Sequence, residues 1–246
     1  MLRRVSLLAL ATIAGCASAT VNEGDDDNVD AARIDGTPGD VDAPPGTIDA
    51  PVTPVDARII DAPAIQTITL AQGPTTITAA NTVSCNATGI TAENSYYRAF
   101  RLADHGVNSA FTANRIDVGI ESATAGIGTS QTIQVKLYTV AGAFPAGVLT
   151  QIAGQIATVT NTTTGTVLPV TLSPTGLAPA GSTIVAEVFI PDGAATNNSI
   201  FIGSNTAAET GPSYIRAPDC GSTQPATLAS VGFPNVHMVI TVTGTY

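Results

Sequence analysis

Tryptophan is absent from the 246 residues, aromatic residues make up only 4% of them, and there are two histidines and three cysteines. Basic residues are scarce as well, with nine Lys and Arg against nineteen Asp and Glu. Proteins that bind a phosphate backbone need basic patches, so the composition argues against a nucleic-acid partner. The lack of tryptophan argues against a site that stacks sugars on broad aromatic faces.

Motifs of the common catalytic classes are missing too. There is no G-x-S-x-G, H-E-x-x-H, P-loop or C-x-x-C sequence. His105 lies between Asp104 and Gly106, as expected of a turn, and His237 is expected to face solvent on the last strand. A triad or a carboxylate pair can still be assembled by the fold from distant residues. We nevertheless expect a protein that is not an enzyme, with no cofactor and no metal.

The first residues resemble the export signal of bacterial lipoproteins. Arg3 and Arg4 precede an apolar run, residues 5–14, which is too short to span a bilayer as a helix. Residues 13–16 read Ile-Ala-Gly-Cys, which matches the lipobox of that family. The alternative is an ordinary secretory signal that is cleaved shortly after Cys16.

The resemblance implies that residues 1–15 are a signal peptide and that Cys16 is the acylated first residue of the mature protein. Two acyl chains give stable membrane attachment where one does not. Residue 17 is Ala rather than the Asp that tends to retain such proteins at the inner membrane, so the resemblance implies the outer membrane. The membrane, reached through this lipid, is the first expected partner.

Residues 17–63 hold eleven of the nineteen acidic residues and are rich in Ala, Pro, Gly and Thr. Their like charges repel, prolines favour extended backbone, and there is too little apolar surface to offset the entropy of ordering. We therefore predict a disordered acidic tether over residues 16–63. Calcium binding by Asp25, Asp26 and Asp27 competes with this interpretation, but the glycine turn and the final Glu of an EF-hand loop are missing.

With Cys16 assigned to the lipobox, Cys85 and Cys220 remain. In an exported chain two leftover cysteines usually pair, so we predict a Cys85–Cys220 disulfide. The alternative is two buried free thiols. Cys220 falls within residues 203–235, where we see little strand pattern, so a disulfide would pin this long segment to the region before residue 96.

From residue 64 onward, Thr, Val, Ile and Ala alternate in short runs separated by Gly, Pro and Asn, which is a β pattern. The expected strands are residues 66–70, 75–79, 96–102, 115–122, 132–140, 154–160, 166–172, 183–190, 199–203 and 236–243. This spacing predicts an all-β domain over residues 64–246, an antiparallel two-sheet sandwich with the jelly roll as the favoured topology.

Alternation assigns faces to several of these strands. Ile116, Val118 and Ile120 should point inward, with Asp117 and Glu121 pointing outward. Two further sets should each share a face: Ile133, Val135 and Leu137, and Val236, Met238, Ile240 and Val242.

The strand expected at residues 96–102 places a charged side chain on its inward face. Tyr96, Phe100 and Leu102 place Arg98 on the core side of its strand. A buried guanidinium needs a partner, so either a bulge turns it outward or it meets a carboxylate such as Glu187 or Asp117.

Residues 90–246 also resemble jelly-roll modules that recur in secreted bacterial proteins. The resemblance lies in strand and turn sequences: residues 94–102, 135–139, 144–147, 177–182, 201–205, 211–216 and 232–235. It implies the fold but carries no activity with it.

Five polar or aromatic residues are candidates for a shallow ligand site: Tyr97, Arg101, Asn205, Tyr214 and Arg216. The alternative is that they form interstrand pairs and turn anchors. A structural calcium near Asp192 or residues 197–198 is a further alternative, although Pro-Asp-Gly is a sufficient turn signal by itself.

These observations predict a lipid-anchored cell-envelope protein that displays a non-catalytic β-sandwich for interaction or structural support. The partner at the cell surface would be a protein or a glycan. Carbohydrate binding is the alternative function, and a secreted hydrolase is the third.

Overall fold

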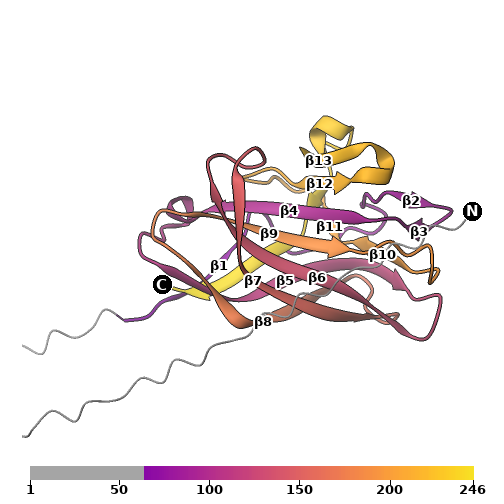
Figure 1. The fold of residues 1–246 in the computed structure, drawn as a ribbon, viewed down its shortest axis with the longest axis horizontal. Helices are drawn as coiled ribbons and strands as arrows, with labels where there is room; N and C mark the ends of the chain where they lie inside the picture. Colours follow the sequence, from indigo (N-terminus) through magenta and orange to yellow (C-terminus); the bar gives the residue numbers. More distant parts are fainter. Residues whose placement is uncertain (1–63) are drawn as a thin grey trace, which may run out of the picture. The chain divides into compact units, whose positions relative to one another are not determined.

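The computed structural model describes residues 64–246. The predicted signal peptide, the lipidation site Cys16 and the tether of residues 16–63 lie outside the described residues. The described chain consists of antiparallel strands, three short 3-10 helices and the segments between them (Figure 1). This confirms the predicted all-β class.

The strands range from two to fourteen residues in length. In chain order they are β1 (Thr67–Leu70), β2 (Asn86–Ala87), β3 (Ile90–Thr91), β4 (Asn94–Arg101), β5 (Phe111–Thr124), β6 (Ser130–Ala141), β7 (Val148–Thr160), β8 (Thr166–Ala178), β9 (Thr183–Ile190), β10 (Ser199–Ile202), β11 (Ser204–Asn205), β12 (Tyr214–Ala217), β13 (Ser222–Thr227), β14 (His237–Met238) and β15 (Ile240–Thr245). The 3-10 helices are η1 (Leu102–His105), η2 (Pro218–Cys220) and η3 (Ala229–Val231).

Two sheets form the sandwich. The five-stranded sheet has the order β1-β15-β5-β10, with β8 on the other side of β5, and the six-stranded sheet has the order β13-β12-β4-β9-β6-β7. If the short strand β10 and the hairpin strands β12 and β13 are left aside, the two sheets have four strands each, in the orders β1-β15-β5-β8 and β4-β9-β6-β7. The connections from β4 to β5, β5 to β6, β7 to β8 and β8 to β9 cross between sheets, which gives the double Greek key of a jelly roll. The predicted topology is confirmed.

Alternation places the core where it was expected. Ile116, Val118 and Ile120 are fully buried, and so are all members of the β6 set. The four residues expected on one face near the C-terminus also join this core. Since each strand supplies a side chain to the core at every second position, the facing sheets bury one continuous apolar layer.

Asp117 and Glu121 lie on the opposite face of β5, as expected, but other groups cover both. Asp117 is only 9% exposed, with Arg115 Nε 2.9 Å from its carboxylate. The backbone N–H of Ala80 donates to Glu121 Oε1 at 2.7 Å. Protein groups therefore cover these carboxylates where solvent was expected, and Glu121 Oε2 is buried with no hydrogen-bond partner among the described residues.

The strand predicted at residues 75–79 is wrong. This segment has no regular structure, and the side-chain amide of Asn205 donates to the carbonyls of Pro74 and Thr76, each at 3.0 Å. Thr78 N donates to Ser204 O at 2.8 Å. The segment thus follows β11 without forming a regular ladder, since side-chain bonds replace part of the backbone pairing.

The predicted Cys85–Cys220 disulfide is confirmed, with Cα atoms 5.8 Å apart and 135 residues between them in sequence. Asn94, at the start of β4, holds Cys85 in place: its Oδ1 accepts from Cys85 N at 2.9 Å, and its Nδ2 donates to Cys85 O at 3.0 Å. Cys220 lies in η2, between β12 and β13, two strands that we did not predict. The disulfide therefore pins this hairpin to the start of β4, and it indicates an extracytoplasmic location.

Arg98 is buried on the inner face of β4 and is 2% exposed. The register between β4 and β9 runs without a shift, so no bulge turns the side chain outward. Its partner is Glu209, at 2.7 Å, and not the expected Glu187 or Asp117. Guanidinium nitrogens also donate to the carbonyls of Met238 and Gly211 and to Gln72 Oε1. Arg98 thereby fixes residues 206–213, the loop between β11 and β12.

Candidate functional site

The outer face of the six-stranded sheet, turned away from the other sheet, carries most of the aromatic and charged side chains that face outward in regular strands. Strand register and alternation define its members. They are Tyr214 and Arg216 of β12, Ser95, Tyr97, Ala99 and Arg101 of β4, Thr183, Val185, Glu187 and Phe189 of β9, and Gln134, Lys136, Tyr138 and Val140 of β6.

Phe144, in the loop between β6 and β7, folds back over this face. Its ring centroid lies 5.6 Å from that of Tyr97 and 4.7 Å from that of Tyr214, the latter edge to face. Tyr97 and Tyr214 stand opposite each other on β4 and β12. Such aromatic contacts add to the area that they bury, so the three rings hold the β6–β7 loop against the sheet.

Beside the rings, Glu187 is a carboxylate on the outer face that is only 6% exposed. It accepts hydrogen bonds from the hydroxyls of Tyr138 at 2.6 Å and Tyr97 at 3.3 Å, and Lys136 Nζ lies 3.6 Å away. Burial, together with the Glu187 charge, raises the pKa of Tyr97 to about 12 and also raises the pKa of Tyr138. Both tyrosines therefore remain neutral donors that satisfy this carboxylate.

A pocket of about 460 Å³ opens at the end of this face, where β4 ends and β9 begins. We call it the end pocket. Its lining residues are Ala71, Gln72, Ala99, Arg101, Asp104, His105, Phe144, Thr183, Thr210, Gly211, Pro212 and Tyr214. The β8–β9 turn, η1 and the β6–β7 loop gather at this end of the sandwich, at the left of Figure 1.

Local structure explains how the walls are held. The first wall is the 206–213 loop, which the buried Arg98 fixes through Glu209 and Gly211. The second is η1, which stops at Gly106, a left-handed residue at φ 75° whose N–H donates to Ala103 O. The third is Phe144. Segments far apart in sequence thus build a preformed cavity, as ligand sites commonly do.

The charged groups of the end pocket are Arg101 and Asp104, with His105 beside them. Arg101 Nη1 lies 3.5 Å from Asp104 Oδ1, and the two side chains are 66% and 64% exposed. Burial lowers the pKa of His105 below its ordinary 6.5, and the opposing effect of Asp104 is smaller. At neutral pH the pocket therefore presents one cation, one anion and a neutral imidazole.

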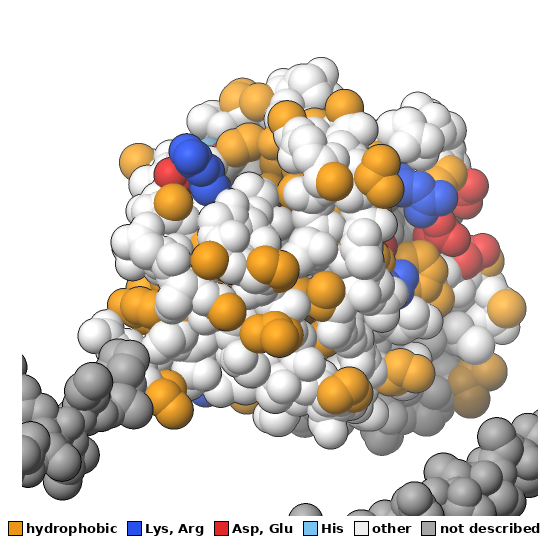
Figure 2. All heavy atoms as spheres, turned by 60° about the vertical axis from the view of Figure 1, so that its left-hand side comes forward, with side chains coloured by type: hydrophobic (Ala, Val, Ile, Leu, Met, Phe, Trp, Pro, Cys, Tyr) orange, Lys and Arg blue, Asp and Glu red, His pale blue; other side chains and the backbone are white. Residues whose placement is uncertain are grey.

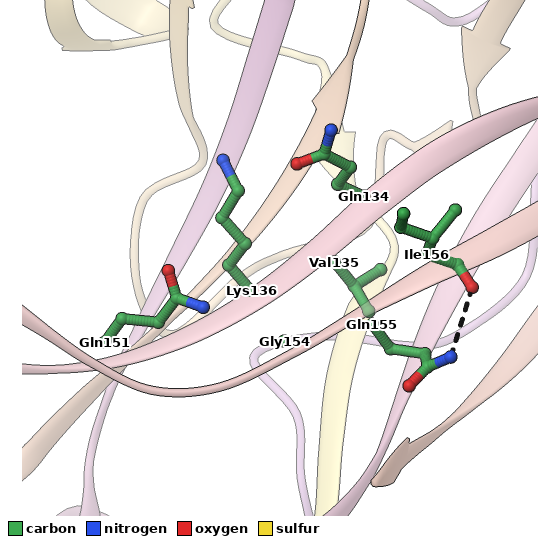
Figure 3. A pocket seen from close by; sticks show the side chains of 7 residues that line it. All are labelled: Gln134, Val135, Lys136, Gln151, Gly154, Gln155 and Ile156. Atoms are coloured by element: carbon green, nitrogen blue, oxygen red, sulfur yellow. Dashed lines mark hydrogen bonds between the residues drawn. The ribbon is translucent and has the colours of Figure 1, made fainter. Parts of the chain in front are cut away.

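A second depression, of about 400 Å³, lies over β6 and β7 (Figure 3). Gln134 and Lys136 come from β6, and Gln151, Gln155 and Ile156 come from β7. Gly154 also lines the depression, and a Cβ there would lie 2.8 Å from Gln151 Nε2. Gln155 Nε2 donates to the carbonyl of Ile156 at 3.4 Å. The depression is shallow and lacks an aromatic wall, which makes it a weaker candidate site.

Figure 2 shows one face of the molecule in space-filling form, with hydrophobic side chains scattered singly among polar ones. Isolated apolar side chains of this kind are normal on protein surfaces. This face therefore does not add a broad apolar docking surface to the two depressions.

The structure brings four of the five predicted site residues onto one face. Arg101 and Tyr214 line the end pocket, Tyr97 lies beneath Phe144, and Arg216 forms a 2.6 Å ion pair with Glu93 at the other end of β4. Asn205 lies elsewhere, 4% exposed on β11 with its amide engaged by backbone carbonyls. Sequence reasoning missed Phe144, because nothing in a loop sequence indicates that the loop folds back.

The prediction that His237 faces solvent is wrong. Its ring nitrogens contact the carbonyls of Ala207 and Pro234, and Nε2 lies 3.8 Å from Glu209. The 206–213 loop covers it. Alternation gave the correct face of the strand for His237. It could not show that the 206–213 loop packs over that face.

Within residues 64–246 no three His, Cys, Asp or Glu side chains are grouped so as to hold a metal ion. Nor does any helix in this part of the chain have the length and apolar character needed to cross a membrane. Asp192 Oδ1 accepts from Ala194 N at 2.9 Å, and Asn198 Oδ1 accepts from Gly126 N at 3.2 Å. The first bond supports a local turn, and the second joins the β9–β10 loop to the β5–β6 loop.

The whole sequence matches no protein-family profile and no curated protein. The fold defines the class, a jelly-roll β-sandwich stabilised by a disulfide. Many unrelated functions share this architecture, so the function has to be argued from the end pocket itself.

Proposed function

We propose that this chain is an exported, lipid-anchored bacterial envelope protein whose β-sandwich is a non-catalytic binding module, with the end pocket as its recognition site. One observation carries the binding part of this proposal: three separately anchored segments surround a cavity that joins an aromatic wall to an exposed ion pair. Pockets that combine apolar walls with a few convergent polar groups are the default ligand sites of proteins.

The anchor rests on the lipobox at residues 13–16 and on the apolar run before it. The disulfide is consistent with export, because such bonds persist in oxidising compartments. With Ala at residue 17 we propose the outer membrane as the destination. Labelling with radioactive palmitate tests the anchor: the natural chain should incorporate label, and a Cys16→Ser variant that still does so would contradict acylation at this residue.

Binding without catalysis is supported by the surroundings of the titratable groups. General acid–base catalysis relies on groups whose pKa is tuned and which closure of the site shields from water. The Asp104 carboxylate is well exposed and paired with Arg101. Solvent therefore reaches this acid, and the pocket does not shield it as a closed catalytic site would.

An array of printed oligosaccharides and peptides, probed with the full-length protein in detergent, tests the site. Thr210 is exposed and lines the end pocket, so Thr210→Phe should fill it and abolish binding. Thr175→Phe makes the same change at an exposed position on β8 and should bind like the natural chain. Binding that survives Thr210→Phe would place the recognition site elsewhere.

Carbohydrate binding is the second candidate function. It is supported by the position of Phe144 and Tyr214 in the same cavity as Arg101 and Asp104. Aromatic side chains offer both an apolar surface and, in tyrosine, a polar group to an amphipathic ligand.

A further inference from the structure

We propose that the end pocket binds a neutral sugar residue, with Arg101 and Asp104 bridging two adjacent hydroxyls and Phe144 packing against the C–H face of the sugar ring. This inference rests on the proposed function, because it names the ligand class of the same pocket. Its support comes from the ion pair, the charge balance and the aromatic wall.

The Arg101–Asp104 pair supplies complementary hydrogen-bonding groups side by side. A guanidinium only donates and a carboxylate only accepts, whereas each hydroxyl of a diol does both. At 3.5 Å and about two-thirds exposed, the pair is loose and reachable from solvent. Hydrogen bonds to charged groups are stronger than those between neutral groups. Two neighbouring hydroxyls can therefore engage both residues at once.

The charge balance of the pocket favours a neutral ligand. An anion attracted to Arg101 would meet the Asp104 carboxylate beside it, and a cation attracted to Asp104 would meet the guanidinium. Two further ion pairs lie nearby: Arg98 pairs with Glu209 on the inner side of the 206–213 loop, and Lys136 pairs with Glu187 beside the three rings. A ligand that carries a full charge therefore gains little from this site.

The apolar side of the pocket fits the other half of a sugar. Phe144 is half-buried and is held in place by Tyr97 and Tyr214, so its ring needs no reordering when a ligand arrives. Thr183 and Thr210 add hydroxyls around the rim. Walls on three sides favour a compact ring over an extended peptide, which would need an open groove.

The array of oligosaccharides and peptides is the first test, with three probe classes: neutral oligosaccharides (glucans, galactans and mannans), oligosaccharides that contain uronic acids, and peptides. We expect the full-length protein in detergent to bind at least one neutral oligosaccharide. Titration calorimetry with that oligosaccharide should then show binding weakened about tenfold or more by Arg101→Lys, which keeps the charge but loses the planar fork. Asp104→Asn and Phe144→Leu should have effects of similar size, and Thr175→Phe should have none.

The outcomes separate the two proposals. If binding is lost in Thr210→Phe but is confined to acidic oligosaccharides or to peptides, the neutral-sugar inference is wrong and the binding function stands. If no probe binds, or if binding is unchanged by Thr210→Phe, the proposed function fails together with the inference. Thermal unfolding and native maleimide labelling of each variant show whether it still folds with the Cys85–Cys220 disulfide closed.

Discussion

Arg98 and Arg101 stand three residues apart on β4, and each has one carboxylate partner, yet the two pairs lie in opposite surroundings. Arg98 faces the core, is almost fully buried and holds a carboxylate at 2.7 Å along with two backbone carbonyls. Arg101 faces out, and its partner at 3.5 Å is exposed to solvent. The change of face alone decides which pair serves as structure and which remains open to a ligand.

The largest effect is expected from the inner pair. Arg98→Met should lower the free energy of unfolding by about 3–5 kcal/mol, because it leaves Glu209 and two carbonyls partly buried without their donor. Urea unfolding of the variant measures this loss. Adding Glu209→Gln should restore part of the stability by removing the unpaired charge. A single variant as stable as the natural chain would refute the structural role given to Arg98.

The disulfide anchors the neighbouring hairpin, so it is the covalent counterpart of Arg98. Replacing both cysteines, Cys85→Ala with Cys220→Ala, should lower the free energy of unfolding by about 2–5 kcal/mol. Guanidinium chloride unfolding measures the change. Reduction of the natural chain should reproduce it, and equal stability before and after reduction would show that packing alone holds the hairpin.

The third prediction concerns His105, which lies beside the outer pair and makes the stability of the fold depend on pH. Its pKa is lower in the folded chain than the ordinary 6.5 because of burial, so below pH 6.5 the unfolded chain takes up a proton more readily. Stability should therefore rise as the pH increases through the range just below 6.5. His105→Asn should flatten this rise in unfolding curves recorded between about pH 5 and 8. An unchanged slope would assign the pH dependence to other groups.

The smallest effect on stability is expected from the outer pair. Arg101→Ala should change the free energy of unfolding by no more than about 0.5 kcal/mol, since exposed ion pairs contribute little. Thermal unfolding measures this alongside Arg98→Met. A loss as large as that of the inner pair would mean that Arg101 is committed to the fold, and the case for a ligand there would weaken.

Period-two alternation predicted the sandwich and most of its inward-facing residues, because burial on one face imposes that pattern directly. The disulfide followed from counting cysteines. The partner of Arg98 was missed for a physical reason: Glu209 lies in a loop, and no local pattern relates a loop residue to a strand about a hundred residues earlier.

The residues of the candidate site also differ in how far the sequence could predict their positions. Tyr97 and Arg101 alternate with core residues on a strand that the sequence predicted, so their outward face could be foreseen. Tyr214 and Arg216 lie on β12, a strand that was not predicted, so their place beside Tyr97 came only from the structure. Asn205 was misplaced because β11 is only two residues long, too short for alternation to define a face. Phe144 depends on a loop that folds across the sheet, and it shows that the wall of a pocket can come from a segment with no periodicity.

The disulfide has a consequence for how the molecule withstands damage. It closes a covalent ring from Cys85 to Cys220 that contains β2 to β12, whereas β1 and β13 to β15 lie outside it. A single backbone cut between these cysteines leaves two pieces that are still joined through sulfur. In a compartment exposed to proteases, a nick in the β6–β7 loop would therefore not free either half of the sandwich, and the pieces would have only a short search before they packed together again.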